Sequence, residues 1–197
     1  MIRRLVLGLA VAVAVAVGVG VGSAALAQSD EDVLVIDVDG EAKGTIEVRL
    51  RPDLAPQHVG RIKELARAGA YDGVVFHRVI DGFMAQTGDV RFGKREIAAE
   101  GRAGTGGSDL PDLAAEFTDA PFVAGTVGMA RSMDPDSANS QFFIMFAPAP
   151  HLEGQYTVVG EVVAGQEVVD AIKRGAGGNG EVSDPDWMAR VRVKADG

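Results

Sequence analysis

Hydrophobic and polar residues alternate along much of this chain in short runs that predict β-strands. Residues 45–50 (TIEVRL) alternate with a period of two, which indicates a strand with one buried face. Seven other short runs predict further strands at residues 33–38, 75–80, 84–88, 126–130, 141–146, 157–163 and 189–194. The pattern therefore predicts eight strands in all.

Two segments have the periodicity of short amphipathic helices. The first begins at Pro56, ends before Gly69, and repeats apolar residues at helical spacing, at Val59, Ile62, Leu65 and Ala66. The second is predicted at Gln166–Arg174 and stops at Gly175. Eight strands with glycine-rich connections and two helices favour a mainly β domain, either an antiparallel sandwich or a closed barrel. Residues 92–110 form a predicted long loop, a kind of segment that often carries function.

The N-terminal segment differs in composition from the rest. MIRR supplies positive charge, a long Val- and Ala-rich run follows, and Ala25-Leu26-Ala27 has the small-x-small pattern of a cleavage site. Residues 1–27 are therefore predicted to be a signal peptide, and the protein to be exported to the periplasm or the extracellular space. The apolar run approaches the length that spans a bilayer, so membrane anchoring by residues 5–27 is the alternative. Residues 28–32 (QSDED) predict a solvated acidic tail, and residues 33–197 a single domain.

Charge and the absence of cysteine exclude several classes of function. The chain has 28 acidic and 19 basic residues, and a negative surface repels phosphate backbones, so no nucleic acid is expected as a partner. Without cysteine there is no disulfide, thiol nucleophile or thiolate metal site. The three histidines are scattered and have no metal-ligand spacing, so neither metal nor cofactor is predicted. We interpret His58 as a surface residue and His77 as a hydrogen-bonded structural one.

An arginine and a glutamine interrupt the apolar stretch VVFHRVIDGFMAQTGD. A two-residue turn at Asp81-Gly82 would place Arg78 opposite Ala85. A three-residue loop that includes Phe83 would instead place Arg78 opposite Gln86. We predict the second register, in which directly opposed side chains share a face and the glutamine can orient the guanidinium. Phe83 is then expected to tip from the loop toward the same site.

Residues 71–88 (YDGVVFHRVIDGFMAQTG) resemble the signature of the cyclophilins, which are peptidyl-prolyl cis/trans isomerases. Residues 125–131 (GTVGMAR) and 137–144 (SANSQFFI) resemble two further family segments in the same order, the second typical of the bacterial branch. The resemblance implies the family fold, a closed eight-stranded antiparallel barrel capped by two short helices. It also implies catalysis without metal or cofactor.

The resemblance further implies the site residues. Arg78 and Gln86 would be catalytic, and the substrate-binding residues would be Phe83, Met84, Ala130, Arg131, Gln141, Phe143, Leu152 and Tyr156. Tyr156 stands where many relatives have His, and His151 where the family often has Trp or Phe. That aromatic position matters for the inhibitor cyclosporin, so weak cyclosporin binding is expected while turnover is retained.

Together these features predict an isomerase that assists the folding of exported proteins by acting on their proline-containing segments, and we expect it to be a monomer. Rotation about an X-Pro bond breaks amide resonance but makes no bond to carbon, which fits a chain without a nucleophile or metal site. The alternative is a cyclophilin-like binding module or holdase in which catalysis is incidental or lost.

Overall fold

The computed structural model describes residues 29–197, so the predicted signal peptide and Gln28 lie outside the described residues. Two α-helices lie at Pro56–Arg67 (α1) and Gln166–Ala171 (α2). The strands are Val33–Asp39 (β1), Gly44–Leu50 (β2), Val74–Val75 (β3), Arg78–Ile80 (β4), Met84–Thr87 (β5), Thr126–Met129 (β6), Phe142–Met145 (β7), Val158–Ala164 (β8) and Trp187–Val193 (β9). Short 3₁₀ turns occur at Asp30–Asp32 (η1), Ala98–Glu100 (η2), Pro150–Leu152 (η3) and Lys194–Asp196 (η4).

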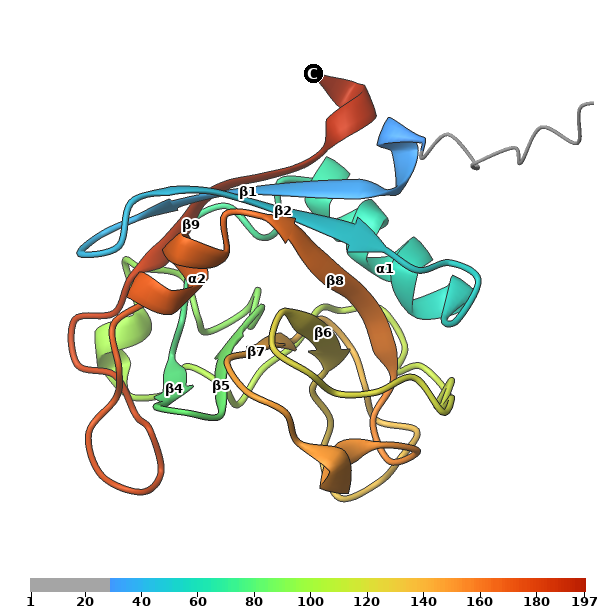
Figure 1. The fold of residues 1–197 in the computed structure, drawn as a ribbon. Helices are drawn as coiled ribbons and strands as arrows, with labels where there is room; N and C mark the ends of the chain where they lie inside the picture. The colour runs from blue at the N-terminus through green and yellow to red at the C-terminus, as the bar shows by residue number, and fades with distance from the viewer. Residues whose placement is uncertain (1–28) are drawn as a thin grey trace, which may run out of the picture.

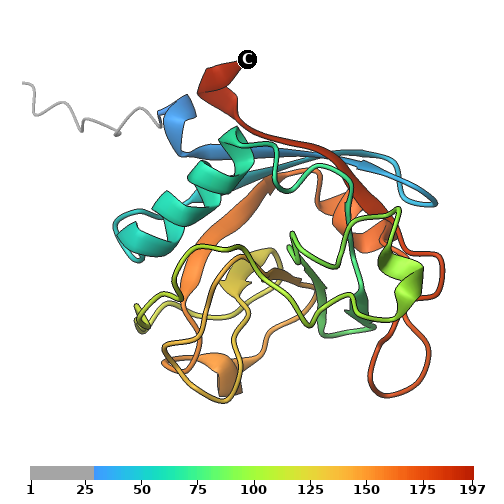
Figure 2. The ribbon, with the colours of Figure 1, turned by 180° about the vertical axis from the view of Figure 1, so that it is seen from behind.

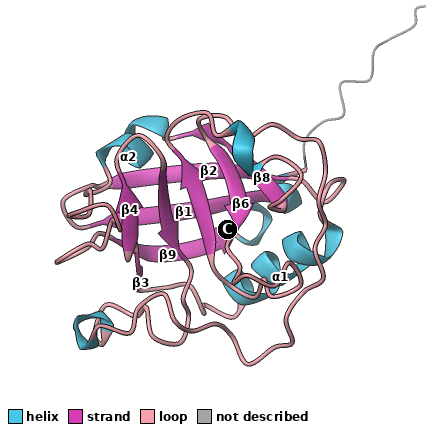
Figure 3. Cartoon of the chain, turned by 90° about the horizontal axis from the view of Figure 1, so that it is seen from below, coloured by secondary structure: helices cyan, strands magenta, loops and turns pink. Residues whose placement is uncertain are grey.

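The strands form one curled antiparallel sheet. Its nine strands follow the order β3-β9-β1-β2-β8-β6-β7-β5-β4. Figure 1 shows β1, β2 and β9 on one side of the molecule and β4 to β7 on the other, and Figure 3 shows strands crossing in two directions. Helices α1 and α2 lie on opposite sides of the curled sheet (Figures 2 and 3). The mainly β class with two helices is therefore confirmed.

The prediction of a closed eight-stranded barrel is wrong, because the strand expected at residues 75–80 is divided into β3 and β4. β3 pairs with β9, and β4 pairs with β5. Between them, the Phe76 N–H donates to the carbonyl of Asp186 (2.8 Å), and the His77 carbonyl accepts from Val182 (3.2 Å). On β4 itself, the Val79 N–H donates to the Gly180 carbonyl (2.7 Å) and the Val79 carbonyl accepts from Gly175 (2.9 Å), so a loop occupies its outer edge. Within residues 29–197, no ladder joins the two ends of the sheet.

Two hydrophobic clusters fill the fold, and β7 separates them. Phe142 and Ile144 belong to the main core inside the curled sheet, whereas Phe143 and Met145 point into a second, smaller cluster. This alternation is what a strand buried on both faces produces. In α1 the four apolar residues expected at helical spacing are all buried, as predicted.

Helix α2 ends earlier than the predicted Gln166–Arg174, because a buried carboxylate draws the chain away after Ile172. Asp186 is 1 % exposed and accepts hydrogen bonds from the backbone N–H groups of Glu41 (2.6 Å), Ala42 (3.1 Å) and Lys173 (2.8 Å). The bond to Lys173 fixes an extended Ile172 at the helix end. One side chain thereby ties the β1–β2 turn to the loop after α2.

Two carboxylates of the acidic segment at the start of the described chain form ion pairs with side chains of α1. Asp32 forms an ion pair with Lys63 (2.6 Å), and Glu31 forms one with Arg67 (2.9 Å). Lys63 and Arg67 both belong to α1, so the two carboxylates lie near the C-terminal end of that helix. Within residues 29–197 no helix is long and apolar enough to cross a membrane.

The interpretation of His58 as a surface residue is wrong, because the residue is fully buried. Its Nδ1 lies 2.6 Å from a carboxylate oxygen of Glu116, which also accepts hydrogen bonds from the backbone N–H groups of Gln57 and His58. Burial alone would raise the pKa of Glu116, but these hydrogen bonds hold it below its usual value. Since Ala55 at the N-cap has no side-chain acceptor, Glu116 caps α1 from a distant loop.

Candidate active site

The β4–β5 hairpin has the predicted register. Arg78 lies opposite Gln86 and Ile80 opposite Met84, so the loop between them holds three residues. The Phe83 N–H donates to the Ile80 carbonyl (3.0 Å), and Gly82 has a positive φ of 67°, a conformation that glycine adopts without strain. Arg78 and Gln86 therefore share one face of the sheet.

Two acceptors orient the Arg78 guanidinium. Its Nη1 donates to Gln86 Oε1 (3.2 Å), and its Nε donates to the backbone carbonyl of Asn179 (3.1 Å). One acceptor lies across the hairpin, and the other lies in the loop between α2 and β9. These two hydrogen bonds fix the plane of the guanidinium, so its remaining N–H donors point in a fixed direction.

A chain of hydrogen bonds supports Gln86 in turn. Gln86 Nε2 donates to Gln141 Oε1 (3.0 Å), and Gln141 Nε2 donates to the carbonyls of Gly104 (3.0 Å) and Gly106 (2.7 Å). Because the Gln141 amide nitrogen donates to these two carbonyls, its amide oxygen points toward Gln86 and accepts from the Gln86 amide nitrogen. The amide oxygen of Gln86 is therefore oriented toward the guanidinium of Arg78 and accepts from it.

The loop that supplies these carbonyls is fixed by Asp89, which sequence reasoning missed. This fully buried carboxylate accepts the backbone N–H groups of Gly104 (2.8 Å) and Gly106 (2.9 Å). It also accepts those of Arg91 (3.0 Å) and Phe92 (2.9 Å). A chain of contacts therefore runs from Asp89, through the 104–106 loop and both glutamines, to Arg78.

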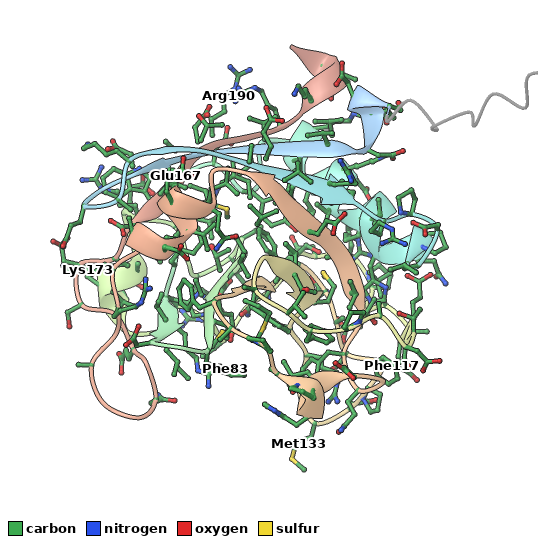
Figure 4. The ribbon with its side chains drawn as sticks, viewed as in Figure 1. Phe83, Phe117, Met133, Glu167, Lys173 and Arg190 are labelled. Carbon is green, nitrogen blue, oxygen red and sulfur yellow. The ribbon has the colours of Figure 1, made fainter. Side chains whose placement is uncertain are left out.

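Next to the guanidinium lies a cavity of about 400 Å³, which we call the proline cavity. Its lining includes every site residue expected from the sequence except Gln141: Arg78, Phe83, Met84, Gln86, Ala130, Arg131, Phe143, Leu152 and Tyr156. Gln141 lines an adjoining cavity of about 460 Å³, beside the 104–107 loop. Figure 4 places Phe83 on the face of the molecule remote from Arg190 of β9.

The floor of the proline cavity is apolar and rigid. Met84, Phe143 and Leu152 are almost wholly buried and belong to the second hydrophobic cluster. The Phe143 ring stacks on Phe122 (5.9 Å between centroids) and meets the ring of Tyr156 edge-on (5.8 Å). These contacts pack the Phe143 ring on two sides, and its apolar surface suits a slot for a small apolar ring.

The polar rim contains one residue that the sequence did not indicate, Gln155. Its backbone carbonyl accepts hydrogen bonds from Nε (3.2 Å) and Nη2 (2.8 Å) of Arg131, whose guanidinium lies 4.4 Å from the Tyr156 ring centroid. Gln155 Nε2 donates to the carbonyl of His151 (3.0 Å), another lining residue. No sequence pattern marks Gln155, because its role depends on a turn of irregular backbone.

The geometry suits noncovalent chemistry. A fixed cation borders an apolar slot, and the lining residues include no nucleophile–base pair. Among residues 29–197, no group of three or more histidine and acidic side chains is placed to hold a metal ion.

Comparison with known proteins identifies the family. Residues 33–193 match the family model of the cyclophilin-type peptidyl-prolyl cis-trans isomerases. A probable peptidyl-prolyl cis-trans isomerase of Brucella suis biovar 1 is 60 % identical over 155 residues, which cover 78 % of this chain and 79 % of the relative. A homologue from Brucella abortus is 59 % identical over the same length, with the same coverage of both chains.

Solved cyclophilin structures have the same fold as this chain. A cyclophilin from Hirschia baltica superposes with a TM-score of 0.69 at 25 % identity, covering 85 % of this chain and 76 % of that one. A Cryptosporidium parvum cyclophilin-type isomerase, crystallised in the presence of the dipeptide Ala-Pro, has the same TM-score at 22 % identity, covering 82 % of this chain and 98 % of that one. The chain belongs to the cyclophilin family of peptidyl-prolyl cis-trans isomerases. Its enzymatic activity is the isomerisation of X-Pro peptide bonds.

His77 has a different environment from the one predicted. Its side chain is 8 % exposed, but within the described chain neither ring nitrogen has a hydrogen-bond partner. The ring packs so closely on Gly104 that a Cβ there would lie 2.7 Å from its Cδ2. Burial lowers the pKa of His77 to about 4.

This buried histidine should make stability depend on pH. The unfolded chain takes up the His77 proton near pH 6.5, whereas the folded chain takes it up only near pH 4. As pH falls from 6.5 to 5, the free energy of unfolding should therefore decrease by about 1.5 kcal/mol through this residue. Urea denaturation of the protein and of His77→Phe at both pH values measures the effect.

The Phe variant should lose this part of the pH dependence. His151→Phe, which replaces an exposed histidine, is the matched control and should retain it. Equal pH dependence in the protein and in His77→Phe would contradict the assignment.

Proposed function

We propose that this isomerase acts on proline-containing segments of exported proteins as they fold, with Arg78 as the main catalytic group. The observation that carries the proposal is the guanidinium held by Gln86 and Asn179 at the edge of an apolar cavity. X-Pro bonds isomerise in tens to hundreds of seconds because rotation must overcome amide resonance, with a barrier of roughly 18–20 kcal/mol. Folding chains therefore wait for this step.

Arg78 would act on the twisted amide. When planarity is lost, the proline nitrogen becomes pyramidal and regains a lone pair. A donor aimed at that lone pair stabilises the twisted form and has little to bind in the planar one, which is the condition for catalysis. Gln86 would act as a positioning residue by keeping the donor in place.

The apolar slot would supply the rest of the acceleration. One charge-assisted hydrogen bond contributes about 1.5–3 kcal/mol, which corresponds to roughly 10–100-fold in rate. Phe83, Met84, Phe143 and Leu152 would seat the proline ring away from water, where the amide is less well solvated and twists more easily. Gln141 and the backbone at Ala130 and Arg131 would hold the flanking peptide.

Replacing the guanidinium tests the mechanism directly. In a protease-coupled assay on a short Ala-Pro peptide, Arg78→Ala should lower kcat by about 10–100-fold and change peptide binding only modestly, because the lost bond forms in the twisted state. Arg190→Ala removes an exposed arginine on the opposite side of the molecule (Figure 4) and should leave kcat unchanged.

The same assay separates this proposal from a binding module without catalytic purpose. Undiminished turnover in Arg78→Ala would refute the role of the guanidinium. An unsubstituted protein that binds proline peptides without accelerating their isomerisation would favour the holdase alternative.

His151 is expected to weaken cyclosporin binding. It stacks on Phe83 at the cavity rim (5.9 Å between centroids), where a larger aromatic ring would offer more apolar surface and an indole donor. His151→Trp should therefore tighten cyclosporin binding by about 2–10-fold in calorimetric titration, which is roughly the increment of an aromatic contact. Ala189→Trp, on an exposed position of β9, is the control. Tight binding by the unsubstituted protein would contradict the inference.

Export is inferred from residues 1–27. A positive start, an apolar run and the Ala25-Leu26-Ala27 motif support secretion followed by cleavage. N-terminal sequencing of the protein produced in a bacterial host should give Gln28 as the first residue, and Ala27→Lys should block cleavage because the site requires small side chains. A chain that keeps Met1 and stays with the membrane would instead support the anchored alternative.

A further inference from the structure

A third cavity lies on the other side of the catalytic arginine. It has a volume of about 670 Å³, within the range of ligand sites, and we call it the Arg95 cavity. Arg78 and Gln86 line both this cavity and the proline cavity. The two hollows are thus neighbours that share the catalytic side chain.

Two loops form its walls. One contains Arg95 and η2 and continues to Thr105, and the other runs from Asn179 to Pro185 between α2 and β9. Figures 1 and 2 show the yellow-green η2 and the orange-red loop side by side, next to β4. The Asn179 carbonyl that holds Arg78 Nε belongs to the second wall. Anything bound in the cavity therefore lies beside the group that orients the catalytic guanidinium.

The walls carry opposite charges and hydroxyl groups. The guanidinium of Arg95 lines the cavity and is stacked 3.7 Å above the ring of Trp187, which fixes its plane. On the other wall lies the exposed carboxylate of Glu181, and the hydroxyls of Thr105 and Ser183 add further polar groups. A ligand with both donors and acceptors fits such walls better than an apolar one.

We propose that the Arg95 cavity binds the polar stretch of client polypeptide on one side of the proline. A chain seated in the proline cavity passes Arg78 and Gln86 to reach it, because those residues border both hollows. Extended polypeptide presents alternating N–H and C=O groups, which match donors on one wall and acceptors on the other. This inference rests on the proposed function, since it extends the same binding site along the client.

Kinetics with peptides of different length test the proposal. A short Ala-Pro peptide occupies the proline cavity alone, whereas peptides extended by several polar residues on its N-terminal or C-terminal side can also enter the Arg95 cavity. One of the two extensions should lower KM about fivefold or more, as added polar contacts do, and leave kcat little changed.

Two variants should abolish that gain. Ala99→Trp and Ser183→Trp place a large ring at the mouth of the cavity from opposite walls, and both replace exposed residues. Each should retain the activity on the short peptide, which also shows that the variant is folded. Ala189→Trp, on β9, is the matched control and should keep the full gain.

Fluorescence gives an independent readout in the unsubstituted protein. Trp187 is the single tryptophan of the chain and lies against Arg95, so the favoured extended peptide should alter its emission and the short peptide should not. The proposal is overturned if neither extension lowers KM, or if the gain persists in the folded Trp variants. Absence of activity on the short peptide would instead refute the proposed function.

Discussion

The pairing of Arg78 with Gln86 across a three-residue hairpin loop is the constraint on which the site depends. Side chains alternate between the faces of a strand, so a slip of one residue would turn the guanidinium away from the proline cavity. The register fixes only the face, however. The direction of the guanidinium depends on a further chain of contacts that ends at the buried carboxylate of Asp89. Strand pairing and loop hydrogen bonds thus divide the task of positioning one cation.

The double burial of β7 explains how a shallow site is kept rigid. One face of the strand belongs to the main core, and the other carries Phe143 into the second hydrophobic cluster. Gly128 on β6 makes this possible, because a Cβ there would lie 2.6 Å from the Phe143 ring. The slot is therefore built directly on a core strand, so the packing of the curled sheet holds its floor in place.

Local sequence predicted what depends on local geometry. Counting residues between Arg78 and Gln86 sufficed for the hairpin register, and apolar spacing sufficed for the buried face of α1. The division of β3 from β4 depends on a bond between Phe76 and Asp186, residues far apart in sequence. The burial of His58 likewise depends on Glu116, which comes from an irregular loop. Hydrophobic periodicity reports only local structure and gives no sign of contacts between distant residues, so these features could not be predicted from the sequence.

The fold contains a group that responds to pH, whereas the proposed chemistry needs none. An arginine remains charged at any pH at which the protein is folded, and rotation about an amide transfers no proton. The proline cavity therefore needs no titrating group for its proposed task. His77 is the residue next to Arg78 in the sequence, and its ring packs against Gly104. Burial keeps the ring neutral by lowering its pKa to about 4, and within residues 29–197 neither ring nitrogen has a hydrogen-bond partner. Protonation of His77 in acid should consequently loosen the 104–106 loop that supports Gln141, and through it the orientation of Arg78.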